Sequence, residues 1–470
     1  MTQKTGRIKI EPLQSILTAR EQRAFLKKQI ADKGFPCLSL SLNVPGFPKS
    51  NPTVQLFFSH VLTDLKYFLK ANLIELSEDE SICRPDDTGD FYLSPCSGYG
   101  KPIEEIKQLC EDFEGNHSLG RFIDVDLNDA QGNTISSGKS KPCFFCGERP
   151  AIECRRMEAH NSDEIRIFMF SKMAEYCRQQ RENILVKRIS SLGLKALLDE
   201  ISLSPKPGLI DKFSNGSHSD MDFQTFLASS AAISGWFEEL VRAGFSFKGN
   251  DLTKALPVIR NIGLRMESDM YASTKNINTH KGLIFLMGLS LFACGKLFSR
   301  QDRFDAAVFR SIIRDICKDI VEKELAPVKV SKATHGEEIY RKYGYSGARG
   351  EAENGFPMVF EFGLPQLTAV EKPGEEELFK SLLAISSNNQ DTNILYRRGP
   401  IVLTSFRNLC KKALEDLNAA NLSAVAEFCK SENISPGGSA DLLAVTIFVD
   451  SVMRADQKKE FTPLSELNDF

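Results

Sequence analysis

The stretch Leu38-Ser39-Leu40-Ser41-Leu42-Asn43-Val44 decides the fold of the first part of the chain, because leucine and valine alternate in it with serine and asparagine. Successive side chains of a strand point to opposite faces of a sheet, so this segment would have one apolar and one polar face. Pro45-Gly46 follows directly and ends the run. The pattern predicts a β-strand that is buried on one face only.

A second alternating run starts at Arg121. We expect its apolar residues on one face of a strand, namely Ile123, Val125 and Leu127. The opposite face would carry Phe122, Asp124 and Asp126. The turn-like segment 129–133 follows and predicts a hairpin. Because helical patterns stand beside these strands, the first part of the chain is expected to be an α+β domain.

Helix signals differ between the two parts of the chain. Thr18 and Glu21 have the spacing of a capping box, which predicts a helix from there to about residue 33. After about residue 185 helical spacing dominates. Asp222 can cap a helix that Gly244 stops, and Asp251 can cap another. Further helices are expected over 280–297, 305–325, 403–416 and 440–454.

Length and pattern together predict the domain organisation. A chain of 470 residues is too long for a single core. We expect a multidomain protein, with an N-terminal α+β domain over residues 1–180. An all-α domain with glycine-rich loops would follow over residues 181–470.

Composition excludes several classes of function. A net charge of -3 offers no general attraction to a polyanion, so nucleic acid is not an expected partner. The longest uncharged run, 282–295, is shorter than the roughly 20 residues that span a membrane. The N-terminus has no apolar region of a secretory signal. The twelve cysteines are expected to be reduced, as they are in the cytoplasm. We therefore expect a cytoplasmic protein that does not bind or span a membrane.

Two groups of candidate metal ligands lie in the N-terminal half. Asp124 and Asp126 would share one strand face and can hold one Mg²⁺ ion, with Arg121 beside them to bind phosphate. An ordinary exposed strand face would show the same pattern. The other group, spaced Cys-x2-Cys-x7-Cys-x5-His, can form a tetrahedral, structural Zn²⁺ site. Reduced thiols and a polar surface histidine are the alternative reading of Cys143, Cys146, Cys154 and His160.

Five loop segments of the C-terminal half combine glycine, histidine, carboxylate and cation, and four of them lie at predicted helix ends. Such positions offer free N–H groups and a positive dipole end to phosphate. Each segment alone is more simply a helix cap or a structural histidine, and together they predict an anion or nucleotide pocket. The segments are 205–209, 216–222, 278–282, 347–357 and 435–441.

The motifs in this half resemble those of triphosphoribosyl-dephospho-CoA synthases. They include PKPGL (205–209), GSHSDMDF (216–223), NTHKG (278–282) and SPGGSADLLA (435–444), in that order. The resemblance implies a reaction of ATP with 3′-dephospho-CoA that gives 2′-(5″-triphosphoribosyl)-3′-dephospho-CoA and adenine. The client enzyme would be either citrate lyase or malonate decarboxylase.

This resemblance suggests roles for individual residues. Asp220 and Asp222 would hold Mg²⁺ on the triphosphate or stabilise charge at the ribose. Glu351 and Asp391 are candidates for the general base. Instead of a role in the reaction, Asp222 could simply cap a helix. Arg397 could likewise lie in a solvated turn without binding phosphate. The expected nucleotide and phosphate contacts are Lys206, His218, His280, Lys281, Arg349, Arg397, Gly437, Gly438 and Ser439.

The N-terminal half resembles apo-citrate lyase phosphoribosyl-dephospho-CoA transferase over about residues 15–180. Arg20, Arg23, Lys49 and the segment LGRFIDVD (119–126) carry this resemblance. It implies attachment of the prosthetic group to a serine of the citrate lyase acyl carrier (gamma) subunit, with release of pyrophosphate. The resemblance favours citrate lyase over malonate decarboxylase as the client.

Two other classes remain open on the residues themselves. A zinc-dependent scaffold or binding protein would explain the cysteine cluster but not the five loops. An all-α hydrolase of N-glycosides related to ADP-ribose would use the same aspartates and histidines. Such a hydrolase would release adenine from ATP without dephospho-CoA.

Overall fold

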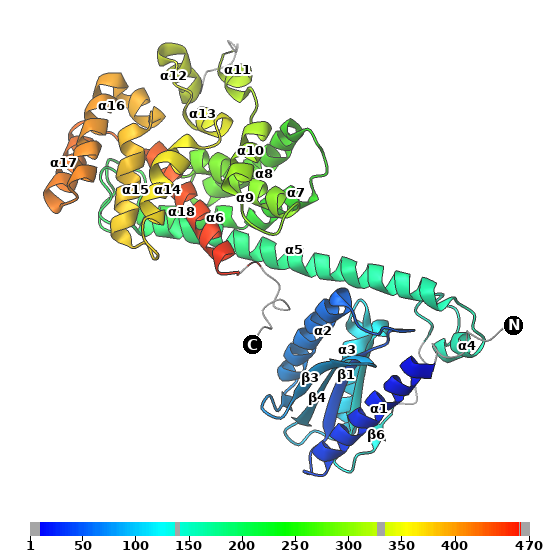
Figure 1. The fold of residues 1–470 in the computed structure, drawn as a ribbon. Coiled ribbons are helices and arrows are strands. Elements are labelled where there is room, and N and C mark those ends of the chain that lie inside the picture. The colour runs from blue at the N-terminus through cyan, green and yellow to red at the C-terminus, as the bar shows by residue number, and fades with distance from the viewer. Residues whose placement is uncertain (1–9, 137–141, 327–333, 460, 462–470) are drawn as a thin grey trace. The chain divides into compact units, whose positions relative to one another are not determined.

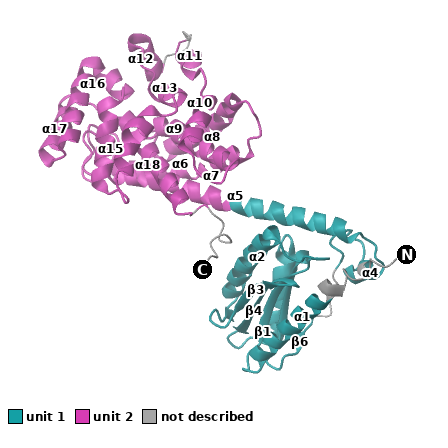
Figure 2. Cartoon of the chain, in the orientation of Figure 1, with its two compact units in different colours: residues 1–181, 463–470 teal, residues 182–462 magenta. Residues whose placement is uncertain are grey.

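The computed structural model describes residues 10–136, 142–326, 334–459 and 461 (Figure 1). The chain divides into two compact units between Arg181 and Glu182 (Figure 2). The N-terminal unit holds an antiparallel sheet with helices, and the described residues of the C-terminal unit form helices joined by loops, without a strand. The expected fold class, an α+β domain followed by an all-α domain, is confirmed.

One antiparallel sheet organises the N-terminal unit. Its strand order is β2-β4-β1-β5-β6, and β3 also pairs with β4. The alternating segment 38–44 lies largely in β1, which pairs with β4 on one side and β5 on the other. The strands are β1 (Cys37–Leu42), β2 (Glu75–Leu76), β3 (Ile82–Asp86), β4 (Gly89–Ser97), β5 (Ile123–Asn128) and β6 (Thr134–Ile135).

Alternation gives the sheet two different faces. Leu38, Leu40, Val125 and Leu127 are buried in a core with side chains of α2, α3 and α5. The opposite face carries the serines of β1 and the aspartates of β5, and α1 contacts β1 and β4. The helices are α1 (Ile10–Ala31), α2 (Pro52–Ala71), α3 (Ile103–Asn116), η1 (Gly120–Phe122), α4 (Ala151–Arg156) and α5 (Ser162–Ser202).

The C-terminal unit is built around α9 (Lys281–Phe298), which packs against α7, α8, α10 and α18. Among the described helices α9 is long and apolar enough to cross a membrane, but 83% of it is buried within the protein, as expected of a core helix. The other first helices of this unit are α6 (Phe223–Ser234), α7 (Phe237–Ser246), η2 (Leu252–Lys254), α8 (Ala255–Ser273), α10 (Ala306–Ile316) and α11 (Ile320–Leu325).

Later helices complete this unit, and two of the five glycine-rich segments, 347–357 and 435–441, lie at the ends of α13 and α18. They are α12 (His335–Tyr343), α13 (Gly347–Glu353), η3 (Met358–Gly363), α14 (Leu364–Thr368), α15 (Glu375–Asn388), α16 (Thr392–Glu415), α17 (Ala419–Ser431) and α18 (Gly437–Gln457). Within α16, Gly399 has non-helical φ and ψ and Pro400 follows it, so two helical stretches meet there at a kink. A proline inside a helix is a common cause of such a kink.

Four sequence predictions differ from the structure. The prediction of a cap at Thr18 is wrong, because its hydroxyl donates to the Gln14 carbonyl inside α1. The helix after Asp222 is interrupted at Gly235, and the one over 305–325 is interrupted at Asp319, which has a positive φ. Phe122 does not share the exposed face with the aspartates, since it is buried in η1.

Candidate functional site

A large cavity of about 2110 Å³ opens over the polar face of the N-terminal sheet. Ser39 and Ser41 of β1 line it, together with Asp124 and Asp126 of β5. The register places Asp126 beside Ser39 and Asp124 beside Ser41. The one-sided alternation that buries the leucines therefore also exposes the two carboxylates to the cavity.

Asp124 and Asp126 share one strand face, as the sequence predicts. Both are only partly buried, so an ion or substrate can reach them. The ammonium of Lys107 lies 3.9 Å from a carboxylate oxygen of Asp126 and adds a positive charge beside the pair. Two carboxylates two residues apart on a strand are suitable ligands for one Mg²⁺ ion, whose remaining ligands would come from substrate and water.

Six basic side chains line the cavity beside the acids Asp32, Glu158 and Asp163, and these cations can bind phosphate groups. Those at the cavity are Arg20, Arg23, Lys27, Lys28, Lys49 and Arg121. Arg23 is held in place by a bidentate contact of 2.7 Å to Asp86 and by the Gly89 carbonyl. Partial burial lowers the pKa of Arg121 below its usual value. Lys27 and Lys28 were missed in the sequence, where they look like part of an ordinary exposed helix face.

The guanidinium of Arg121 is fixed from one side. Its Nε and Nη2 atoms donate to the Pro142 carbonyl at 3.1 and 2.7 Å. Pro142 directly precedes Cys143 and forms an isolated bridge with Pro150. The expected phosphate contact is therefore attached to the cysteine-rich segment.

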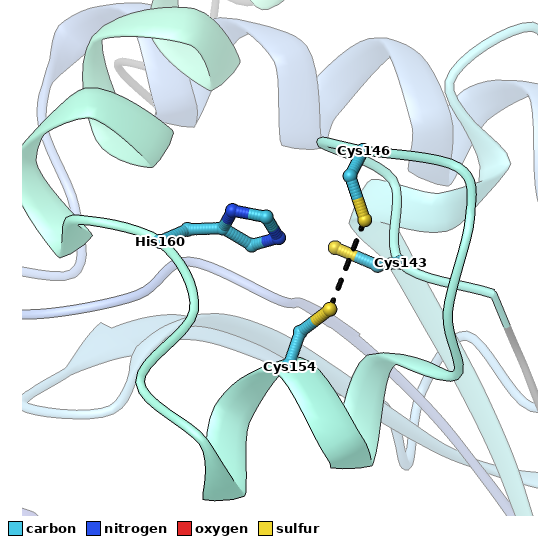
Figure 3. Close-up of side chains that lie close together, drawn as sticks. All are labelled: Cys143, Cys146, Cys154 and His160. Atoms are coloured by element: carbon cyan, nitrogen blue, oxygen red, sulfur yellow. Dashed lines mark hydrogen bonds between the residues drawn. The ribbon is translucent and has the colours of Figure 1, made fainter.

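The four predicted zinc ligands lie together (Figure 3). One ligand atom from each of Cys143, Cys146, Cys154 and His160 lies within 4.8 Å of the others, and the described residues contain no other such group of three or more. None of these three cysteines forms a disulfide. Backbone N–H groups, that of Glu148 first, lower the pKa of Cys146 to about 6.

In the C-terminal unit, the segments 278–282 and 435–441 meet beside Asp391 at the N-terminus of α18. Asp391 caps α16 and also accepts from Ser439, at 3.0 Å from the N–H and 3.2 Å from the hydroxyl. A Cβ on Gly438 would lie 3.2 Å from Asp391, and one on Gly282 only 2.2 Å from Asp441. Burial raises the pKa of Asp391. The glycines at these positions let two helix ends come close to the carboxylates.

Lys206 and His280 have partners inside the protein. The Lys206 ammonium is buried and lies 2.5 Å from Glu200. The Nδ1 atom of His280 lies 2.6 Å from the hydroxyl of Ser229, and burial lowers the pKa of His280 to about 3. Both side chains are therefore buried and paired inside the protein.

The two carboxylates of the segment 216–222, those of Asp220 and Asp222, are exposed to solvent. Asp222 caps α6, where its Oδ1 atom accepts from the Thr225 N–H and hydroxyl, which lowers its pKa. Asp220 is exposed and lies 3.8 Å from Nδ1 of His218. Burial lowers the pKa of His218, and the charge of Arg397 acts in the same direction. Arg397 itself donates to the Asn433 carbonyl.

The segments 278–282 and 347–357 contain one carboxyl group with a shifted pKa, that of Glu351. They also contain two cations in ion pairs, Arg349 and Lys281. Burial raises the pKa of Glu351 to about 7, and its Oε2 accepts from the Met358 N–H at 3.1 Å. Arg349 donates to Glu324 at 2.9 Å. Lys281 lies 2.9 Å from Glu267, whose carboxylate raises the lysine pKa.

Glu200 is a buried acid and Asp441 a partly buried one, and neither was predicted from the sequence as a site residue. Burial raises the pKa of Asp441 well above its usual value, and the nearby charges of Glu200 and Asp391 add to that effect. Asp441 stands in the quoted motif SPGGSADLLA, so the motif itself was a signal. Glu200 lies in the last turn of α5, and only the fold brings it to Lys206.

Comparison with known proteins adds a match for each unit. A family model described as ATP:dephospho-CoA triphosphoribosyl transferase matches residues 186–460. Another, described as apo-citrate lyase phosphoribosyl-dephospho-CoA transferase, matches residues 11–176. The protein CitXG of Leuconostoc mesenteroides subsp. cremoris is 31% identical over 461 residues, which are 93% of this chain and 96% of the relative.

Two further relatives agree with these matches. The protein CitXG of Haemophilus influenzae is 32% identical over 93% of this chain and 95% of its own length. The 2-(5″-triphosphoribosyl)-3′-dephosphocoenzyme-A synthase of Pectobacterium atrosepticum is 38% identical over 280 residues, which are 59% of this chain and 91% of the synthase.

Proposed function

The chain belongs to the family of the CitXG fusion proteins, and from this premise we propose how its two units divide two consecutive transferase reactions. Both resemblances seen in the sequence are confirmed. The chain is a bifunctional transferase that makes the prosthetic group of citrate lyase and attaches it.

The C-terminal unit uses ATP and dephospho-CoA. The 2′-oxygen of 3′-dephospho-CoA attacks the ribose C1 of ATP, a C–O bond forms, and the C–N bond to adenine breaks. A base takes the hydroxyl proton, adenine takes up a proton as it leaves with the electron pair of the broken bond, and carboxylates stabilise the oxocarbenium-like charge at C1. Glu351 is suited to the role of base, because a carboxyl with a pKa of about 7 can both accept and release a proton at neutral pH.

The N-terminal unit transfers the phosphoribosyl-dephospho-CoA group to a serine of the citrate lyase acyl carrier subunit. The serine oxygen attacks the phosphate next to the ribose, and pyrophosphate leaves. Arg20, Arg23 and Arg121 would bind the phosphates, and Asp124 and Asp126 would hold Mg²⁺. The ion supplies positive charge that offsets the charge developing on the leaving pyrophosphate. In the C-terminal unit, Asp220 and Asp222 would also hold Mg²⁺.

The observation that carries this assignment is the cavity with two carboxylates on one wall and several fixed cations around it. Small anionic substrates fit such a lining, and the proposal includes neither nucleic acid nor membrane as a partner. We also propose that Cys143, Cys146, Cys154 and His160 hold a structural Zn²⁺ ion. The substrates ATP and dephospho-CoA are consistent with a cytoplasmic location.

Replacing Asp124 tests the division of labour. Asp124→Asn removes one charge from the pair, so transfer to the carrier should fall by at least about 100-fold. Adenine release from ATP and dephospho-CoA should be unchanged, because that reaction belongs to the other unit. Asp112→Asn, an exposed site on α3, is the matched control. Full transfer activity in Asp124→Asn would remove this carboxylate from the site.

A further inference from the structure

We infer that a zinc ion held by Cys143, Cys146, Cys154 and His160 fixes the cavity wall that holds Arg121. Zinc would then position a substrate-binding residue for the transfer reaction. This inference rests on the proposed function of the N-terminal unit. It concerns residues 142–160 and the cavity beside them.

One distance between two sulfur ligands matches a tetrahedral zinc ion, and all four ligand atoms lie within 4.8 Å of one another. A Zn–S distance of about 2.3 Å places two sulfur ligands about 3.8 Å apart in a tetrahedron. The Sγ atoms of Cys146 and Cys154 are 3.7 Å apart, and they are not joined in a disulfide. Three thiolates with one imidazole form a ligand set that zinc prefers.

The histidine gives a separate indication. The Nε2 atom of His160 is buried and has no hydrogen-bond partner in the structure. A buried ring nitrogen without a partner is costly, whereas coordination of a metal ion would satisfy it. Figure 3 shows the His160 ring directed toward the three sulfur atoms.

The segment that carries the ligands needs a cross-link. Cys143 and Cys146 lie in a tight turn, in which the Gly147 N–H donates to the Cys143 carbonyl and Gly147 has a φ of 72°. Cys154 lies in α4, a helix of only 6 residues, and His160 lies between α4 and α5. Such short elements cannot bury a core of their own, so a metal ion would stabilise them.

Contacts lead from this cluster to Arg121. The residue before Cys143 is Pro142, whose carbonyl accepts both hydrogen bonds from the Arg121 side chain. The Phe144 ring packs edge-on against Phe122, with ring centroids 5.1 Å apart. The turn is therefore attached to Arg121 and to the residue after it.

The same segment forms part of the cavity wall. Cys143, Phe144, Ile152, Cys154 and His160 all line the cavity that contains the two aspartates. Loss of the ion would release this wall and the Pro142 carbonyl. Arg121 would then lose its fixed position relative to Asp124 and Asp126.

Metal analysis of the full chain tests whether zinc is present. We expect about one zinc ion per chain by elemental analysis. Cys146→Ser should lose this zinc and lower the melting temperature of the N-terminal unit. Cys83→Ser is the matched control, because Cys83 is an exposed cysteine of β3 in the same unit. Wild-type chain without zinc after reconstitution, or full zinc content in Cys146→Ser, would overturn the inference.

Kinetics then test whether zinc acts through Arg121. Chelation of the wild-type chain should raise the KM of the triphosphoribosyl substrate in the transfer reaction about 10- to 100-fold. Added Zn²⁺ should restore the KM, and Mg²⁺ should not. In Arg121→Ala the KM is already high, so chelation should change it little further. Equal fold-changes on chelation in both proteins would overturn the positioning role.

Adenine release distinguishes the two proposals. The C-terminal reaction should be unaffected by chelation followed by Mg²⁺ addition. If the wild-type chain contains zinc but never modifies the carrier, the proposed function fails while the metal site stands. If it modifies the carrier equally well without zinc, the inference fails and the proposed function stands.

Discussion

Three carboxylates of the C-terminal unit show how burial changes the chemistry of one side-chain type. Asp222 is exposed at a helix N-terminus, and its hydrogen bonds lower its pKa. Asp391 is buried, and burial raises its pKa despite the contacts with Ser439. Glu351 has a pKa of about 7. Because proton transfer is most efficient near the working pH, we propose Glu351, of the three, as the base.

The pKa of Glu351 predicts a pH dependence. The folded value of about 7 lies above the usual 4.5, so the folded state keeps this proton to a higher pH than the unfolded chain does. The contribution of Glu351 to stability should be present below pH 4.5 and be lost as the pH rises through about 7. Glu351→Gln cannot ionise, so its melting temperature should exceed that of the wild type more at pH 8 than at pH 5.

Activity should move in the opposite direction. As the base, Glu351 must be deprotonated, so adenine release should rise with pH through about 7 and fall at least about 100-fold in Glu351→Gln. Glu322→Gln on α11 is the control, because Glu322 is exposed. Normal adenine release in Glu351→Gln, with the same pH profile, would exclude Glu351 as the base.

The sequence allowed some site residues to be predicted, but not the partners with which others are buried. Asp124 and Asp126 were predictable, since strand alternation alone places them on one face. Lys206 and His280 were recognised by motif, but a sequence does not show that Glu200 and Ser229 will bury with them. Those contacts join segments that are far apart in the chain or meet only through tertiary packing.

At the scale of elements, local signals predicted where structure begins better than where it is interrupted. The alternating residues of β1 and β5 and the caps at Asp222 and Asp251 are all present. The breaks at Gly235 and Asp319 were missed, because apolar spacing continues across them. A break of this kind is decided by packing of the two halves against different neighbours.

The cap at α6 allows structural and chemical roles of Asp222 to be separated. Asp222→Ala removes the cap and should lower the melting temperature of the unit. Asp222→Asn keeps a capping oxygen but loses the charge, so its melting curve should be nearly unchanged. If the charge serves the reaction, adenine release should fall by about 100-fold or more in both variants.

Another capping aspartate provides the control for this experiment. Asp251 caps η2 in the same unit and is exposed, so Asp251→Asn should leave adenine release normal. Near-normal adenine release in Asp222→Asn would instead leave Asp222 as a plain helix cap.

At the scale of the whole molecule, each unit has its own hydrophobic core. The clusters around β1 and β5 use residues up to Cys177, and the large helical cluster begins at Leu185. The matched family regions, 11–176 and 186–460, follow the same division. Separate cores allow each unit to fold around its own site, and one chain keeps the product of one unit near the other.

If this one chain both makes the prosthetic group and attaches it, the purified chain alone should modify the carrier. The most direct measurement is an intact-mass spectrum of the citrate lyase acyl carrier subunit after incubation with the purified chain, ATP and 3′-dephospho-CoA. We predict that the carrier gains the mass of one phosphoribosyl-dephospho-CoA group, and that adenine and pyrophosphate appear in equal amounts. An unmodified carrier, or adenine released from ATP in the absence of dephospho-CoA, would contradict the account.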